Sequence, residues 1–192
     1  MIPGVNYPWT IYEGRPNYGC DFGRNRWNSH AGVTAHLDEV RADFDGMAAD
    51  GFEVARWFVF TDGRGGVDWH TSGELAGIAD RLTDDMDAAV DVAGAAGVRL
   101  CLVLIDFTWL DDPARRAALE STAFIDRVLD PFLDRYGAHD AIHSYDVINE
   151  PDCGAASTTR VAQDRPAISR LRRGKFSASA GVPSGYSLTR TP

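Results

Sequence analysis

Four short stretches of the chain are mostly apolar, and each has the length of a buried strand. Each of them contains β-branched residues, and a loop is predicted after each. The four predicted strands are residues 2–9, 52–60, 98–106 and 142–150.

Between these strands the apolar residues recur at three- and four-residue spacing, which predicts helices. The first is expected at residues 34–50 with Thr34 as its N-cap. A glycine-rich loop at 61–73 precedes a second helix at 74–96, and a third helix is predicted in pieces over 114–136. Apolar strands that alternate with helices predict a parallel sheet covered by helices, with the functional residues in the long loops after the strands.

The repeat has a regular period. The strand ends at Asn6, Arg56, Ile105 and Glu150 are 50, 49 and 45 residues apart. Four such βα units occupy about 150 residues, and eight form a (β/α)8 barrel. The predicted fold class is therefore α/β: a partial (β/α)8 TIM barrel of about four N-terminal βα units.

The charge is divided unevenly along the 192 residues, whose net charge is −9. Residues 1–152 carry 27 acidic side chains against 12 arginines, a net charge of −15. This acidic part argues against nucleic acid and anionic membranes as partners. Because no signal peptide and no apolar run of membrane-spanning length is recognisable, a cytoplasmic protein is expected.

Residues 153–192 have a different composition, with a net charge of +6 and no hydrophobic periodicity. Ser, Thr, Ala, Gly, Arg and Pro predominate, so little apolar surface is available to offset the entropy of ordering. We expect two parts, an α/β domain at 1–152 and a basic, low-complexity, disordered tail at 153–192. The change of composition suggests a shifted reading frame near residue 153; a genuine linker to a second half is the alternative.

The fourth strand ends in Asn149-Glu150-Pro151, which places an amide and a carboxylate at the C-terminal end of a buried strand. Parallel sheets and barrels keep their chemistry at this end. Taken alone, these three residues could equally form a polar turn.

Three segments together resemble the cellulase-like clan A glycoside hydrolases. They are Gly-Val-Asn-Tyr-Pro-Trp at 4–9, Arg-Trp-Phe at 56–58 and Asp-Val-Ile-Asn-Glu-Pro at 146–151. Those enzymes are (β/α)8 barrels that cleave glycosidic bonds with retention of configuration. The resemblance covers residues 2–152 and implies hydrolysis of a β-linked glycan.

The resemblance also implies roles for individual residues. Glu150 would be the acid/base, and Asn149 would contact the sugar 2-hydroxyl. Arg56 would orient the nucleophile, although a buried ion pair between Arg56 and Asp146 is the alternative. Substrate contacts are further expected from Asn6 and Tyr7 of the first strand.

Tryptophan side chains are candidates for stacking on sugar rings, because the apolar faces of sugars pack on aromatic rings. Trp69 and Trp109 lie in predicted loops and are the stronger candidates, whereas Trp9 and Trp57 could as well be core residues. Asp106 stands where the family commonly has a histidine, so a substrate subsite is expected to differ there.

A retaining glycosidase needs two carboxyl groups about 5–5.5 Å apart. In the family the nucleophile is a Glu at the end of strand seven, and we recognise no such strand in this sequence. We therefore expect a truncated glycoside hydrolase with little activity of its own. The alternative is a non-catalytic remnant or a carbohydrate-binding half-barrel.

The expected partner is an oligo- or polysaccharide, without a cofactor or metal. His139 and His143 have the spacing of a zinc pair on a helix, but they flank a turn that enters a strand. Self-association is also expected, because a half-barrel would leave its first and fourth strands as unpaired edges.

Overall fold

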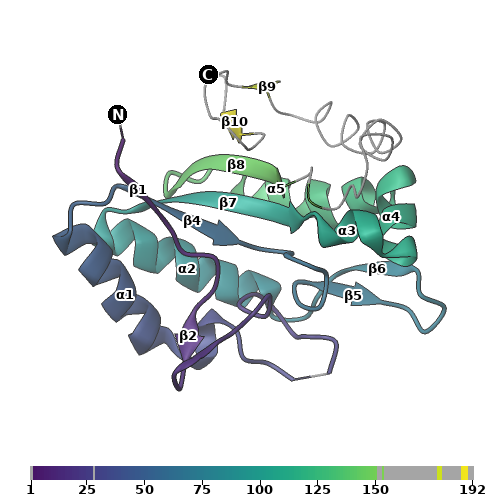
Figure 1. Ribbon diagram of the computed structural model, residues 1–192, viewed down its shortest axis with the longest axis horizontal. Coiled ribbons are helices and arrows are strands. Elements are labelled where there is room, and N and C mark those ends of the chain that lie inside the picture. Colours follow the sequence, from purple (N-terminus) through teal and green to yellow (C-terminus); the bar gives the residue numbers. More distant parts are fainter. Residues whose placement is uncertain (1, 28, 151–152, 154–176, 179–186, 190–192) are drawn as a thin grey trace.

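The computed structural model describes residues 2–27, 29–150, 153, 177–178 and 187–189. Its centre is a parallel sheet of the four predicted strands (Figure 1). These are β1 (Gly4–Asn6), β4 (Val54–Phe58), β7 (Arg99–Asp106) and β8 (Ile142–Asn149), and they pair in this order. Strands that are neighbours in the sequence are therefore neighbours in the sheet, as in a (β/α) barrel.

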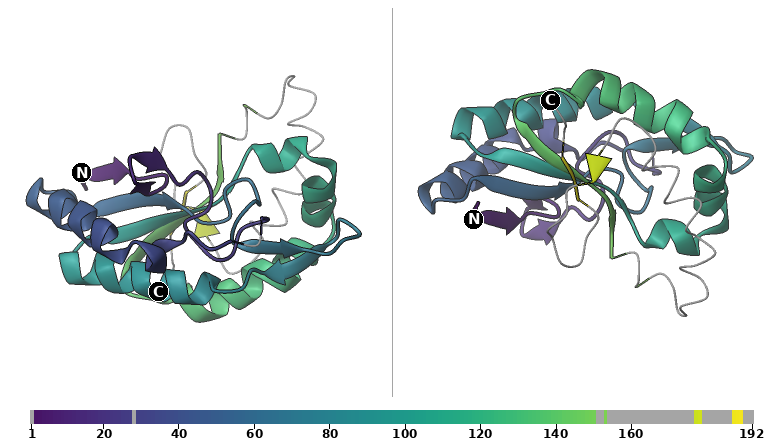
Figure 2. Two further views of the ribbon diagram at one scale, coloured as in Figure 1. Left: turned by 90° about the horizontal axis from the view of Figure 1, so that it is seen from below. Right: turned by 90° about the horizontal axis from the view of Figure 1, so that it is seen from above.

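Helices cover one side of this sheet (Figure 2). The crossovers between the strands contain α1 (Leu37–Ala49), α2 (Leu82–Ala96) and α5 (Asp130–Tyr136). A single 3-10 turn (Val33–Ala35) precedes α1, and a π-helical turn (Ile125–Leu129) leads into α5. Two short helices, α3 (Thr108–Asp111) and α4 (Pro113–Glu120), follow β7, and Asp112 caps α4 by accepting from two backbone N–H groups.

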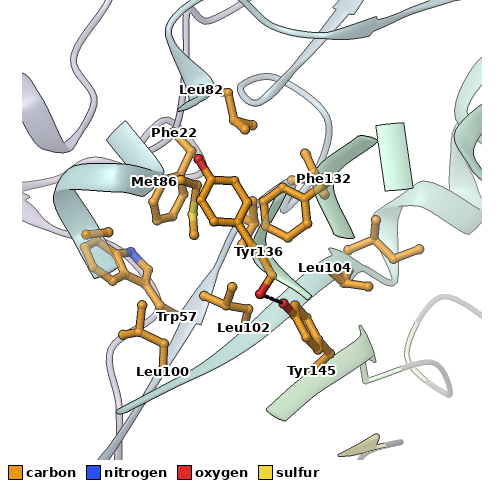
Figure 3. Packing of buried hydrophobic residues seen from close by; sticks show 14 of the residues in the cluster. Phe22, Trp57, Leu82, Met86, Leu100, Leu102, Leu104, Phe132, Tyr136 and Tyr145 are labelled. Atoms are coloured by element: carbon orange, nitrogen blue, oxygen red, sulfur yellow. Dashed lines mark hydrogen bonds between the residues drawn. The ribbon is translucent and has the colours of Figure 1, made fainter. Parts of the chain in front are cut away.

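The core lies between the sheet and these helices (Figure 3). Trp57 of β4 and Leu100, Leu102 and Leu104 of β7 are all buried, since alternate residues of a strand point to the same face. The hydroxyl of Tyr145 on β8 donates to the backbone oxygen of Tyr136 at the end of α5, at 3.0 Å. This hydrogen bond satisfies the polar end of a side chain that otherwise packs in the core.

The opposite face of the sheet carries a different set of side chains. The strand register places Asn6, Arg56, Cys101 and Ser144 side by side across the four strands. A groove of about 400 Å³ runs along this face, and Asp146 is among its lining residues. In a closed barrel this face would be the interior, and it is the face on which these polar residues of the strands lie together.

The long loop between β1 and α1 contains a small hairpin, β2 (Ile11–Tyr12) with β3 (Arg15–Pro16), and it is anchored by a buried carboxylate. Asp21 accepts four hydrogen bonds of 2.7–2.9 Å. The donors are the backbone and hydroxyl of Thr10, the amide of Asn17 and the indole of Trp57. Because all of these groups donate, an ionised carboxylate satisfies them without a paired cation.

A second carboxylate holds the end of the same loop against α2. Asp85 is completely buried and accepts from the backbone N–H groups of Gly23 and Thr34 and from the Thr34 hydroxyl. The imidazole of His30 lies 2.8 Å from the same carboxylate. The prediction that Thr34 caps α1 is therefore wrong, because Asp85 binds its hydroxyl and the N-cap position belongs to His36.

The predicted loop at 61–73 and the start of the helix at 74 are also wrong. An antiparallel hairpin of β5 (Val67–Trp69) and β6 (Leu75–Ile78) occupies this segment, and α2 begins only at Leu82. Gly73 and Gly77 have φ angles of +85° and +154°, which side chains other than hydrogen rarely allow. Gly73 lies in the turn between the two strands, and Gly77 lies within β6, where its φ angle is incompatible with the predicted helix.

Two short strands of the predicted tail are described: β9 (Ser177–Ala178) and β10 (Ser187–Thr189). β10 pairs antiparallel with β8, with Ser187 opposite Asp146 and Leu188 opposite Tyr145. The expectation that the fourth strand is an unpaired edge is therefore wrong for this part of β8. Apart from these strands and Cys153, the predicted disordered tail lies outside the described residues. Within the described part of the chain, the helices are too short or too polar to cross a membrane.

Candidate active site at the ends of the strands

The guanidinium of Arg56 is the centre of the site. Its Nε and Nη2 donate to Oδ2 of Asp146 at 3.2 and 2.6 Å. Nη1 donates to Oδ1 of Asn6 at 3.2 Å, and Nη2 also donates to Oδ1 of Asn149 at 3.0 Å. One side chain of β4 thus connects polar groups from β1 and β8.

Asp106 of β7 extends this network from the other side. Its Oδ2 accepts from Nδ2 of Asn149 at 3.0 Å, and its Oδ1 accepts from the backbone N–H of Thr108 at 3.1 Å. The Asn149 amide therefore has its oxygen toward Arg56 and its nitrogen toward Asp106. Both partners are charged and each fits only one end of the amide, so they fix its orientation.

The ion pair between Arg56 and Asp146 is largely removed from water, with side-chain exposures of 29% and 7%. Burial raises the pKa of Asp146, while the neighbouring guanidinium lowers it and only partly offsets the burial. The structure thus contains the ion pair between Arg56 and Asp146, and a role of Arg56 in orienting a nucleophile stays a prediction.

Glu150 follows Asn149 directly and is exposed, in contrast to the semi-buried position expected of a general acid. Its φ angle is +46°, in the left-handed region that costs a residue with a side chain roughly 1–2 kcal/mol. Strained backbone of this kind is concentrated at functional sites. The backbone oxygen of Glu150 accepts from the Cys153 N–H at 2.9 Å, which closes a turn after the strand.

Three side chains that were predicted to bind substrate pack against other residues of the protein instead. Trp109 is completely buried in α3, so the prediction that its ring stacks on sugars is wrong for this structure. Trp69 is half-buried in β5, donates its indole N–H to Gly63 and packs against Trp109 at 5.9 Å. Tyr7 packs on Phe44 and Trp57, which makes it chiefly a packing residue.

A series of aromatic rings that sequence reasoning did not identify leads away from Arg56. The guanidinium lies 4.9 Å from the ring centre of Phe58, and the ring centres of Phe58 and Trp9 are 6.0 Å apart. Tyr18 follows at 4.2 Å from Trp9. Only Trp9 was a candidate from the sequence, and no pattern in the loop distinguishes Tyr18 from other tyrosines.

The site has no recognisable metal centre. Among the residues that the structure describes, no three His, Cys, Asp or Glu side chains gather closely enough to hold a metal ion. Its chemistry is that of a carboxylic acid beside oriented amide and guanidinium groups, at the C-terminal ends of parallel strands.

The fold is that of part of a glycoside hydrolase (β/α)8 barrel, which solved structures of such enzymes match. The β-mannanase of the blue mussel Mytilus edulis is similar to this chain with a TM-score of 0.63 and 21% identity, over 78% of this chain and 41% of its own. The β-1,4-D-mannanase of Cryptopygus antarcticus gives 0.64 and 22%, over 80% and 40%. The endo-1,4-β-mannanase of Eisenia fetida gives 0.63 and 22%, over 79% and 41%.

The chain thus spans about two fifths of the length of these structures. No protein-family model matches its sequence, and no curated protein matches it either. The similarity is therefore one of fold. It does not by itself assign the activity of the complete barrels to this chain.

Proposed function

We propose that this chain carries the acid/base side of a retaining β-glycoside hydrolase site, with Glu150 as the acid. The observation that supports this most strongly is the network that holds Asn149 next to Glu150. Arg56 of β4 and Asp106 of β7 bind opposite ends of one amide of β8, so three adjacent parallel strands take part. A polar turn without a function has no need for such an arrangement.

The proposed roles follow from the groups that remain available. Asn149 uses one N–H on Asp106, so its second N–H can donate to a sugar hydroxyl. Glu150 is exposed and can approach the glycosidic oxygen, to which it would give a proton as the C–O bond breaks. In a double displacement a second carboxylate attacks the anomeric carbon from the opposite face of the sugar.

The described residues supply no obvious candidate for that second carboxylate. Asp106 lies at the same strand ends as Glu150 and is engaged with Asn149. Asp146 is buried within β8 and is engaged with Arg56. General-acid catalysis alone contributes about 10²–10⁴ in rate, far less than glycoside hydrolysis needs. We therefore propose that the 192-residue chain has little or no turnover by itself.

β-Mannosides are the substrate class that we propose, because several solved structures similar to this chain are described as β-mannanases. The division into a half-barrel at 1–152 and a separate tail, and a cytoplasmic location, stay predictions. So does the alternative of a carbohydrate-binding half-barrel, which would bind the same glycans without any bond cleavage.

An added nucleophile tests the proposal. In molar azide, attack of azide on the anomeric carbon would form a C–N bond and release the aryl alcohol, protonated by Glu150. Cleavage of phenyl β-mannoside should then require Glu150 and be lost in Glu150→Gln. Dinitrophenyl β-mannoside, whose leaving group needs no proton, should be cleaved almost equally by both. Glu39→Gln, an exposed glutamate of α1, is the control.

Three results would speak against this function. Turnover without azide that is far above background and absent in Glu150→Gln would mean that the site is complete. Glycan binding without any azide-dependent mannosyl azide would favour the carbohydrate-binding alternative. An unchanged rate on phenyl β-mannoside in Glu150→Gln would remove Glu150 from the role of acid.

A further inference from the structure

The aromatic series beside the candidate site continues to the surface. From Phe58 it runs through Trp9 to Tyr18, and the guanidinium of Arg64 lies 5.1 Å from the Tyr18 ring centre. Phe58 is buried, Trp9 is partly exposed, and Tyr18 is 49% exposed. Exposure thus increases with distance from Arg56, which indicates a surface that extends outward from the candidate site.

The end of this series is held rigidly in place. Asn17, which precedes Tyr18, donates its amide to Asp21 and to the backbone oxygen of Ala31, at 2.7 and 2.6 Å. Gly19, which follows it, has a φ of +69°, and a Cβ there would lie 3.2–3.3 Å from Asp62 and Thr61. Tyr18 is therefore an exposed ring on an anchored loop, which lowers the entropic cost of binding to it.

Charged groups border the rings. Arg64 forms an ion pair with Asp62 at 2.5 Å, close to Tyr18. Aromatic rings next to hydrogen-bond donors and acceptors suit a ligand with apolar C–H faces and many hydroxyl groups, which describes a glycan.

We propose that Trp9 and Tyr18 form a glycan-binding subsite on the β1 side of the candidate site, which holds sugar units beyond the one bound at Arg56 and Asn149. This inference rests on the proposed function, because it extends the same site. The ligand is a β-linked oligosaccharide long enough to reach from Asn149 to Tyr18. A single sugar or a disaccharide does not gain from the subsite.

The test measures the affinity of the full chain for mannobiose and mannohexaose by calorimetry or ligand-observed NMR. Tyr18→Ala should weaken mannohexaose binding about tenfold and change mannobiose binding less than about twofold, since it removes a stacking contact that only the longer ligand makes. Tyr12→Ala is the matched control, because Tyr12 is also exposed but stacks on His36, outside the series. Asn149→Ala should weaken the binding of both ligands.

The outcomes separate the subsite from the proposed function. If Asn149→Ala weakens binding while Tyr18→Ala behaves like Tyr12→Ala, the subsite is refuted and the proposed function stands. If Tyr18→Ala weakens binding while Asn149→Ala does not, the rings bind glycan but the proposed function is refuted. Absence of any binding by the wild-type chain at millimolar ligand would refute both.

Discussion

Asn149 donates its side-chain N–H to Asp106 at 3.0 Å, across the ends of the neighbouring strands β8 and β7. Since Arg56 already binds the amide oxygen, Asp106 decides where the amide nitrogen points. The carboxylate at this position is thus a positioning group for the residue next to Glu150.

Replacement of Asp106 by alanine should therefore disturb Asn149 before it disturbs the fold. We expect the side-chain amide resonances of Asn149 to shift, and glycan affinity to fall about fivefold, which corresponds to the loss of a hydrogen bond worth about 1 kcal/mol. NMR and calorimetry measure the two effects. Asp91→Ala, an exposed aspartate of α2, should change neither. Unmoved Asn149 resonances in Asp106→Ala would show that Asp106 does not orient the amide.

The raised pKa of Asp146 gives a pH dependence with a definite sign. Burial raises this pKa more than Arg56 lowers it, so the folded state binds the proton more readily than the unfolded state. The resulting stabilisation is fully present below the unfolded pKa of about 4 and is lost as the pH rises through the folded pKa. Asn does not titrate, so only the wild type should lose this stabilisation. The unfolding free energy of the wild type minus that of Asp146→Asn should therefore fall as the pH rises above about 4. Urea denaturation over this pH range measures it, and a difference that grows with pH would mean that Arg56 dominates.

The carboxylate of Asp21 should be irreplaceable even by its isosteric amide. Each of its oxygens accepts two hydrogen bonds. In Asp21→Asn an –NH₂ group, which accepts no hydrogen bond, replaces one of these oxygens. The two groups that donated to that oxygen would then face another donor. We expect a loss of about 2–4 kcal/mol in the free energy of unfolding. Asp45→Asn, on the exposed face of α1, is the control and should change stability by less than about 0.5 kcal/mol. Equal midpoints of denaturation for the two variants would contradict this account.

Replacement of Gly32 and of Gly46 by alanine should change the stability of the protein in opposite directions. A Cβ on Gly32 would lie 2.2 Å from Oδ2 of Asp85 and 2.8 Å from the backbone oxygen of Asp21. Gly32→Ala should therefore destabilise the protein by about 1–3 kcal/mol. A Cβ on Gly46, inside α1, would meet no atom within 4 Å, so Gly46→Ala should stabilise it by about 0.5–1 kcal/mol. Thermal denaturation of both variants compares the signs directly.

Self-association through the first strand stays a prediction. Among the described strands β1 pairs only with β4, and Ile2 beside it is 50% exposed and lines the groove of the inner face. Light scattering should show a mass that rises with concentration. Ile2→Lys should reduce this effect, and Ile11→Lys, on the β2–β3 hairpin, should not. A monomer at every concentration would rule this interface out.

The apolar runs were sufficient to locate the four parallel strands. For β4, β7 and β8 the reason is burial, because strands that are mostly buried need nearly continuous hydrophobic sequence. β1 is the exception, since its residues are exposed or half-buried. The apolar runs were not sufficient at residues 67–78, where we predicted a glycine-rich loop up to residue 73 and a helix from residue 74. There the φ angles of Gly73 and Gly77 permit a hairpin, and packing against neighbouring elements selects it. Local pattern alone does not distinguish the two conformations.

The candidate site also has features that the sequence predicts and features that only the tertiary structure shows. The sequence by itself placed Asn149 and Glu150 at the end of a strand, because the proline that follows them cannot continue it. The strand end predicted at Arg56 is wrong, since Arg56 lies in the middle of β4. Only the tertiary structure decided that Arg56 binds Asp146, that Asp106 turns the Asn149 amide and that Trp109 is buried while Tyr18 is exposed. Those outcomes depend on strand register and on a loop anchored at Asp21, and both bring together residues that no local pattern connects.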